Sequence, residues 1–206
     1  MNGTIIDDMP YHAAAWVEIL AELGHSLTIE AFNRQLSGKT NEEALLEVMG
    51  PETPAARIEE ISTEKEKRYQ AVYGEHMEAI AGFIPLLASL QEKNTPVAVA
   101  TSANQFNIDF TLDGLEIRGE LTAVIGAEDI ENSKPHPEIF LKAAKAMDVA
   151  PENCLVFEDS FMGIEAARRA NMDAYAILTT LTEDEALALP NVISASPDYT
   201  TIRYPN

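Results

Sequence analysis

Hydrophobic residues recur along the chain with a spacing that changes near residue 82. From residue 10 to about residue 80 they return every three or four positions, which is the period of an amphipathic α-helix. This part of the chain is therefore predicted to be helical throughout. Helices are expected at residues 10–24, from residue 28, from residue 40 and at residues 54–77.

Two of these helices carry clear sequence signals. Thr40 begins a Thr-x-x-Glu pattern, in which the hydroxyl and the carboxylate each accept a hydrogen bond from a backbone N–H at the start of a helix. The helix predicted at 54–77 is mostly polar, with one apolar face formed by Ile58, Ile61, Tyr69 and Val72.

After Gly82 the chain alternates between amphipathic helices and short, continuously apolar segments. Strands of this kind, separated by helices, indicate a parallel sheet covered on both faces, so the predicted fold class is α/β. Helices are expected at 83–93, 104–112, 138–147, 161–170 and 183–189, and strands at 97–100, 123–125, 154–157, 174–178 and 191–194.

Composition and charge exclude several classes of partner. The 206 residues carry a formal charge of −20, which repels nucleic acid and anionic membrane surfaces. The same field repels a phosphorylated substrate unless a local cation or a bound metal offsets it. Cys154 is the one cysteine, so no intrachain disulfide is possible, and its apolar surroundings predict a small core residue. With no apolar run long enough to span a membrane and no basic-then-apolar N-terminus, a cytoplasmic protein is expected.

Polar residues follow the predicted strands, at the edge where parallel α/β sheets carry their chemistry. Thr101-Ser102 follows one strand, Lys134 lies beyond another, and Glu158-Asp159 follows a third. Hydroxyls, an ammonium and two carboxylates are the groups that bind a phosphoryl group and a metal ion. The sequence therefore favours a site of this kind at the carboxyl ends of the strands.

Each signal also has a structural alternative. Hard oxygen ligands such as Glu158 and Asp159 suit Mg²⁺, but Asp159 or Ser160 can instead cap the next helix. Lys134 lies in Ser-Lys-Pro-His-Pro, which indicates either a rigidly placed charge or a surface loop before a helix. Thr101 likewise can bind phosphoryl oxygens or cap a helix.

The order of these motifs resembles that of the haloacid dehalogenase (HAD) superfamily. The segments that carry the resemblance are Asn2-Gly3-Thr4, Thr101-Ser102, Lys134-Pro135 and Glu158-Asp159. Within the superfamily the chain looks most like the β-phosphoglucomutase-like branch. That likeness rests on Asp8-Met9-Pro10-Tyr11-His12, Gly38-Lys39-Thr40, Ser133-Lys-Pro-His-Pro137 and the segment 158–167.

The resemblance implies a Rossmann-like core, formed by residues 1–9 and 82–206, with a helical cap inserted at residues 10–81. In the family, the first motif's leading Asp attacks phosphorus to form an aspartyl-phosphate, and the acid two residues later exchanges protons with the substrate. A hydroxyl residue and a lysine hold the phosphoryl oxygens, and an acidic pair holds Mg²⁺.

Carried over residue by residue, this implies catalytic roles for Asn2, Thr101 and Lys134. The implied substrate-binding residues are Thr101, Ser102, Ala103, His12, Gly38 and Lys39, and the implied Mg²⁺ ligands are Asn2 through its carbonyl, Glu158 and Asp159. For His12 an equally good alternative is that its side chain forms hydrogen bonds with nearby residues at the start of a helix.

The first motif departs from the family pattern in two ways. Aligning Gly3 and Thr4 puts the attacking Asp one position before Met1, and the first core strand is missing with it. Losing a central strand would be costly, so the natural protein is expected to begin upstream, with Met1 an internal methionine. Asn2 stands in place of the second acid and cannot exchange a proton near neutral pH.

The sequence thus predicts Mg²⁺-dependent phosphoryl transfer on a small phosphorylated metabolite, by a sugar-phosphate phosphatase or a β-phosphoglucomutase-like enzyme. The alternative is a catalytically impaired, metabolite-binding relative. No nucleic-acid or membrane partner is expected, and the protein is predicted to be a monomer or a weak homodimer. A nucleotide-binding protein is disfavoured because no Gly-x-Gly-x-x-Gly follows a strand, and Gly38-Lys39-Thr40 lacks the earlier glycine of a phosphate-binding loop.

Overall fold

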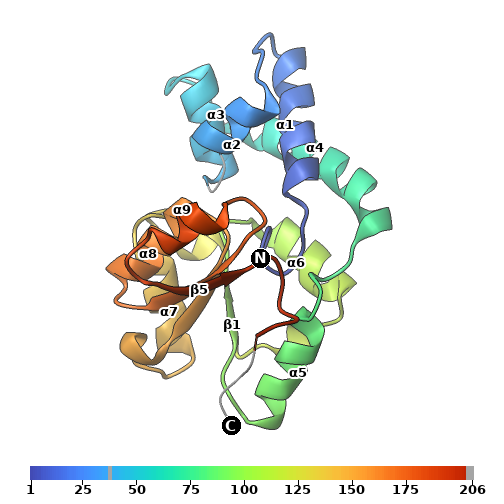
Figure 1. Cartoon of the computed structure of the whole chain (residues 1–206). Coiled ribbons are helices and arrows are strands. Elements are labelled where there is room, and N and C mark those ends of the chain that lie inside the picture. Colours follow the sequence, from blue (N-terminus) through green and yellow to red (C-terminus); the bar gives the residue numbers. More distant parts are fainter. Residues whose placement is uncertain (37–38, 203–206) are drawn as a thin grey trace. The chain divides into compact units, whose positions relative to one another are not determined.

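The computed structural model describes residues 1–36 and 39–202, and its chain divides into two compact units (Figure 1). An α/β unit comprises Met1–Asp7 and Glu78–Asn206, and a helical unit comprises Asp8–Met77. These limits lie within four residues of the domain limits expected from the sequence. Across the described ranges, every helix is too short or too polar to cross a membrane.

The helical unit contains the four helices that the sequence predicts. They are α1 (Met9–Glu22), α2 (Ile29–Gln35), α3 (Asn41–Met49) and α4 (Ala55–Tyr73), followed by the 3-10 turn η1 (Gly74–His76). The predicted capping box at Thr40 is confirmed, since its hydroxyl accepts from Glu43 N and the Glu43 carboxylate accepts from Thr40 N.

The apolar faces of these helices enclose a separate core. Its buried members are Ala13, Trp16, Ile19, Leu20, Phe32, Leu36, Ala44, Leu45, Ile58 and Ile61. On α4 the predicted face is correct for Ile58, Ile61 and Tyr69 but wrong for Val72, which is 58% exposed. Val72 shows that a hydrophobic residue at helical spacing need not be covered, because part of any protein surface is apolar.

The α/β unit confirms the predicted alternation of helices and parallel strands. Its helices are α5 (Phe83–Glu92), α6 (Gln105–Gly114), α7 (Glu138–Ala146), α8 (Phe161–Arg169) and α9 (Glu183–Leu187), with 3-10 turns η2 (Arg118–Glu120), η3 (Ala127–Asp129) and η4 (Pro151–Asn153). Its strands are β1 (Ala98–Ala100), β2 (Ala123–Ile125), β3 (Leu155–Glu158), β4 (Asp173–Ile177) and β5 (Val192–Ser196).

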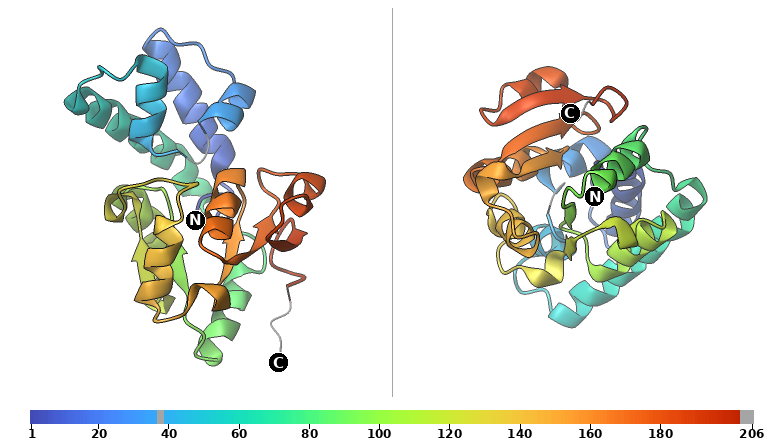
Figure 2. Two further views of the ribbon diagram at one scale, coloured as in Figure 1. Left: turned by 90° about the vertical axis from the view of Figure 1, so that its left-hand side faces the viewer. Right: turned by 90° about the horizontal axis from the view of Figure 1, so that it is seen from below.

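In the described residues the strands form two parallel sheets instead of a single one. The first has the order β1-β2, and the second, orange to red in Figure 2, has the order β3-β4-β5. Met1–Asp7 contributes isolated bridges from Asn2 to Ile6 and from Ile6 to Ala79. The N-terminal segment is also tied to the unit by a hydrogen bond of 2.8 Å from Ile80 N to Ile5 O.

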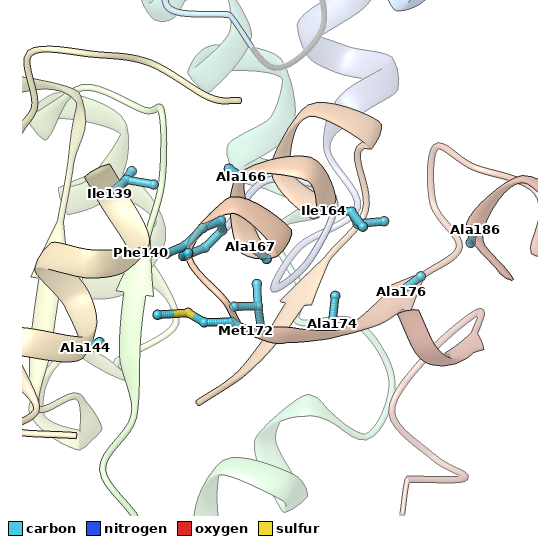
Figure 3. Packing of buried hydrophobic residues seen from close by; sticks show 12 residues of the cluster. Ile139, Phe140, Ala144, Ile164, Ala166, Ala167, Met172, Ala174, Ala176 and Ala186 are labelled. Carbon is cyan, nitrogen blue, oxygen red and sulfur yellow. The ribbon is translucent and has the colours of Figure 1, made fainter. Parts of the chain in front are cut away.

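The core of the α/β unit connects the two sheets through α7 and α8. Ala100 of β1 and Ile125 of β2 pack against the same buried cluster as Val156 of β3. The cluster joins residues of α7, α8, the turn before β4, β4 and α9 (Figure 3), namely Ile139, Phe140, Ala144, Ile164, Ala166, Ala167, Met172, Ala174, Ala176 and Ala186. Strand ends from both sheets are thereby held within one packed unit.

Candidate active site

The acidic pair lies at the carboxyl end of β3, where Glu158 is the last strand residue and Asp159 follows it. Both are buried, at 5% and 6% exposure. The Oε2 atom of Glu158 accepts from Asp159 N at 2.8 Å, Ser160 N at 2.9 Å and Ser160 Oγ at 3.0 Å. Its Oε1 atom accepts from Lys134 Nζ at 2.5 Å. The protein itself therefore fixes the orientation of the Glu158 carboxylate.

The start of α8 is shaped to admit this carboxylate. Ser160 is the N-cap residue and accepts from Gly163 N at 3.1 Å, so Ser160, and not Asp159, caps the helix. A Cβ atom at Gly163 would lie 2.0 Å from Cδ of Glu158. Glycine is required here because the buried carboxylate packs directly against the backbone of the first helical turn.

Asp159 is surrounded by groups from distant parts of the chain. Its Oδ1 atom accepts from Thr4 Oγ1 at 3.2 Å, and its backbone carbonyl accepts from Thr180 Oγ1. Gly3 has a φ of +67°, and a Cβ atom there would lie 2.3 Å from Oδ2 of Asp159. The carbonyl of Gly3 in turn accepts from Thr179 Oγ1 at 2.6 Å. The predicted Asn2-Gly3-Thr4 motif thus lies beside the predicted acidic pair.

The two acids differ in their electrostatic surroundings. Burial alone would raise the pKa of Glu158, but the adjacent Lys134 ammonium lowers it below its ordinary range. Burial, and then the negative charge of Glu158, raise the pKa of Asp159 above its ordinary range. Lys134 therefore compensates the first carboxylate, while burial and the neighbouring Glu158 disfavour the charged form of the second.

Lys134 belongs to the loop between β2 and α7, and its side chain is only 7% exposed. Its ammonium also lies 5.1 Å from the ring centroid of Phe140, a buried residue of α7. The structure thus shows a placed charge instead of a solvated loop lysine. The contact to Glu158 thus joins the loop that follows β2 to the carboxyl end of β3.

Thr101 directly follows β1 and is 4% exposed. Its N–H donates to Ile125 O at 3.0 Å, and its hydroxyl accepts from Ala103 N at 3.2 Å. Asn104, and not Thr101, caps α6. Ser102 Oγ is buried and has no hydrogen-bond partner within the described part of the chain, which leaves a hydroxyl able to donate to a ligand oxygen.

The remaining predicted site residues belong to the helical unit. Lys39 is 28% exposed at its side chain and forms an ion pair with Glu47. Gly38 lies outside the described residues. His12 is 8% exposed, and both of its ring nitrogens have polar neighbours, so its local role is well defined within this unit.

His12 is part of a buried polar cluster that joins α1 and α4. Its Nδ1 atom is 2.8 Å from Lys65 Nζ, and its Nε2 atom is 3.2 Å from Asp8 Oδ2. Lys65 Nζ also donates to Glu66 Oε1 at 2.9 Å, and Tyr69 OH donates to Asp8 Oδ2 at 2.5 Å. Burial lowers the pKa of Lys65, and the neighbouring Glu66 only partly opposes this. The pKa of Tyr69 is raised, chiefly by burial and next by the negative charge of Asp8.

Sequence reasoning missed several of these residues. Thr179 and Thr180 come after β4 and Leu178, so the strand-end rule would have found them had it been applied to that strand. Lys65 and Glu66 gave no such signal, because charged residues in a polar helix are ordinarily solvent-exposed and their partners lie far away in the sequence.

The donor set of the α/β unit fits a hard divalent cation. Two adjacent buried carboxylates lie beside the Asn2-Gly3-Thr4 backbone, and oxygen ligands are those that Mg²⁺ prefers. Over residues 1–36 and 39–202, no three His, Cys, Asp or Glu side chains come together as a metal site. The remaining ligands would therefore be backbone carbonyls, water or substrate oxygens.

Comparison with known proteins gives concordant results. The family model of haloacid dehalogenase-like hydrolases matches residues 1–177. Fructose-1-phosphate phosphatase YqaB of Escherichia coli (strain K12) is 31% identical over 177 residues, covering 84% of this chain and 91% of that protein. Beta-phosphoglucomutase of Bacillus subtilis (strain 168) is 29% identical over 184 residues, covering 86% of this chain and 80% of that protein.

A solved structure shows the same fold. The HAD hydrolase of family IA, variant 3, from Entamoeba histolytica superimposes with a TM-score of 0.88 at 27% identity, covering 98% of this chain and 92% of that one.

Proposed function

The chain belongs to the family of haloacid dehalogenase-like hydrolases, and from this premise we propose that it transfers phosphoryl groups from a small sugar phosphate. The named relatives are a phosphatase and a phosphoglucomutase that act on phosphorylated sugars. Hydrolysis, with water as the acceptor, is the reaction proposed for this chain.

The observation that carries the proposal is the buried ammonium of Lys134, 2.5 Å from Glu158 and next to Asp159 at the strand ends. Phosphoryl transfer depends on positioning and charge neutralisation. Lys134 would neutralise phosphoryl oxygens in a protein whose net charge of −20 otherwise repels them. The buried hydroxyl of Ser102 and the hydroxyl of Thr101 would donate hydrogen bonds to the same oxygens.

Asp159, Glu158 and the backbone carbonyl of Asn2 are the proposed ligands of Mg²⁺. When bound, the ion would supply positive charge against the phosphoryl oxygens. The part played by the chain itself is to hold Asp159 in place through Thr4 and to orient Glu158 through Ser160 and Lys134.

The proposed nucleophile is an aspartate one position before Met1, aligned with the first family motif, which would form an aspartyl-phosphate. At the second acidic position of that motif stands Asn2, which cannot give a proton to a leaving group or take one from an acceptor. We therefore propose slow dephosphorylation of substrates with good leaving groups, in preference to a mutase reaction that uses this acid twice.

Asn2 also supports a second candidate, a sugar-phosphate-binding protein with little or no turnover. In this alternative Lys134, Ser102 and the acidic pair bind the ligand, and no phosphoryl group is transferred. The two candidates differ in whether phosphate is released, and they share the same binding residues.

Phosphate release from a panel of sugar phosphates, with and without Mg²⁺, separates the candidates. The assay uses the chain as printed and a form extended by the codons upstream of Met1. We expect slow release by the extended form with Mg²⁺, an increase of about 10²-fold or more in Asn2→Asp, and loss in Lys134→Met. Lys145→Met, at an exposed lysine of α7, is the matched control and should be active.

The phosphatase proposal is abandoned if no form, including Asn2→Asp, releases phosphate above background. If sugar phosphates then bind and Lys134→Met abolishes that binding, the second candidate is supported.

A further inference from the structure

The loop that carries Lys134 is held to the start of α7 by the side chain of Glu138. Glu138, the first residue of α7, accepts from Glu131 N at 3.1 Å through Oε1 and from Asn132 N at 3.0 Å through Oε2. The side-chain amide of Asn132 also donates to Oε2 at 3.0 Å. The loop therefore folds back on the helix that follows it.

Lys142, one turn further along α7, ties the beginning of the loop to the same carboxylate. Its ammonium lies 2.8 Å from Oε1 of Glu138 and 2.5 Å from the carbonyl oxygen of Asp129. In the turn between, His136 N donates to Ser133 O at 2.9 Å. These contacts hold residues 129–138 at both ends and leave Lys134 at the tip.

An acid in the first turn of a helix with a lysine four residues later is a common surface pair that stabilises the helix alone. Glu138 differs because its carboxylate also binds two backbone N–H groups of the preceding loop. Its side chain is 16% exposed, and the Lys142 ammonium, then the Glu131 N–H, lower its pKa to about 2. A carboxylate that is ionised at neutral pH accepts stronger hydrogen bonds from such amides than a neutral group does.

We propose that Glu138 is a positioning residue for Lys134. Its carboxylate sets the path of residues 131–133, so that the following lysine reaches the buried Glu158 instead of solvent. If Lys134 binds phosphate, as the proposed function holds, phosphate binding depends on Glu138 although Glu138 does not touch the phosphate. In this respect the inference rests on the proposed function.

Three variants separate positioning from helix stabilisation. Glu138→Gln removes the charge and one acceptor oxygen. Glu138→Asp keeps a charge at the start of α7 but is one methylene too short to span both amides. Glu165→Gln is the matched control, because Glu165 is 19% exposed, pairs with Arg168 and Arg169 of its own helix, and has a pKa also lowered to about 2, chiefly by Arg168.

Three measurements are made on each variant of the full chain. Hydrogen exchange reports the amides of Glu131 and Asn132, and mass spectrometry follows the acetylation rate of Lys134 against Lys145 in the same molecule. Titration with inorganic phosphate and Mg²⁺ gives the dissociation constant. We expect Glu138→Gln and Glu138→Asp to raise Lys134 acetylation and to weaken phosphate binding, each by about tenfold, while Glu165→Gln changes neither.

The positioning role is overturned if the loop amides lose protection but Lys134 acetylation does not rise, or if Glu138→Asp behaves like the wild type. Failure of the proposed function is a different result. In that case the wild type does not bind phosphate, whereas Lys134 acetylation still rises in the Glu138 variants.

Discussion

At the scale of single residues, the site depends on places where the backbone approaches a carboxylate too closely for any side chain. Gly3 lies against Asp159 and Gly163 lies against Glu158. Gly3 also has a positive φ, which most residues adopt only with strain. The two acids therefore owe their positions to the glycines as much as to their hydrogen-bond donors.

Replacing Gly163 by alanine should displace the Glu158 carboxylate. The added Cβ would fall 2.0 Å from Glu158 Cδ, so we expect destabilisation by about 1–3 kcal/mol, in the range for overpacking. Gly119→Ala is the control, because a Cβ atom there has nothing within 4 Å, and its stability should change by less than about 1 kcal/mol. Urea unfolding of both variants measures the difference, and equal stabilities would contradict the packing argument.

Lys65 offers a second prediction at this scale, within the buried cluster of the helical unit. Lys65→Met removes the amine that lies between Glu66 and His12, so the buried Glu66 carboxylate loses this hydrogen-bonding partner. We expect the free energy of unfolding to fall by about 3 kcal/mol or more. Lys67→Met, two residues along α4 and exposed, should change stability by less than about 0.5 kcal/mol. The comparison uses denaturant unfolding followed by circular dichroism. A neutral or stabilising Lys65→Met would show that the ion cluster can be replaced by apolar packing.

At the scale of elements, the sequence predicted most helices and strands because local rules determine them. Thr28, Thr40 and Thr182 cap their helices as side-chain acceptors, and the short apolar runs became strands within one or two residues of their expected limits. Periodicity also located the polar strand ends. It could not predict that Lys134 is buried, because that depends on Glu158, 24 residues away.

In the helical unit, too, the sequence does not reveal which charged residues are buried. The charge of Lys65 and Glu66 suggests the solvent side of α4, whereas both are buried against the beginning of α1. The spacing places Lys65 on the apolar face, between Ile61 and Tyr69, but its residue type argues against burial. Their burial is compensated by partners that are distant in the sequence, such as His12, which lies 53 residues before Lys65, and Asn41, which donates to Glu66. Pairings of this kind arise from tertiary structure, so periodicity can place a residue on the buried face but cannot name its polar partner.

The loop before α7 gives a pH prediction for an element. The pKa of Glu138 falls from its ordinary value of 4.5 to about 2 on folding, so its contribution to stability is complete above about pH 4.5 and is lost as the pH falls towards 2. The stability difference between wild type and Glu138→Gln should therefore be largest near neutral pH and shrink below pH 4.5. Urea unfolding at pH 7, 5, 4 and 3 measures it, and a constant difference would contradict the assignment.

At the scale of the whole molecule, the two units have separate hydrophobic cores. The buried clusters of the helical unit and of the α/β unit share no residue within the described ranges. The chain passes between the units twice, at Asp7–Asp8 and at Met77–Glu78. Because each of these clusters lies within one unit, we expect the free energy of unfolding to be divided between two largely independent cooperative transitions.

Scanning calorimetry of two core variants tests this division. Leu45 of α3 and Ile164 of α8 are both 0% exposed, and either substitution to alanine should cost about 2–5 kcal/mol. If the units unfold independently, Leu45→Ala lowers one transition by about 10 °C or more and leaves the other in place, and Ile164→Ala does the reverse. A single transition lowered by both substitutions would instead show that the units unfold together, and the stability effects predicted for Lys65 and Gly163 would then belong to one cooperative system.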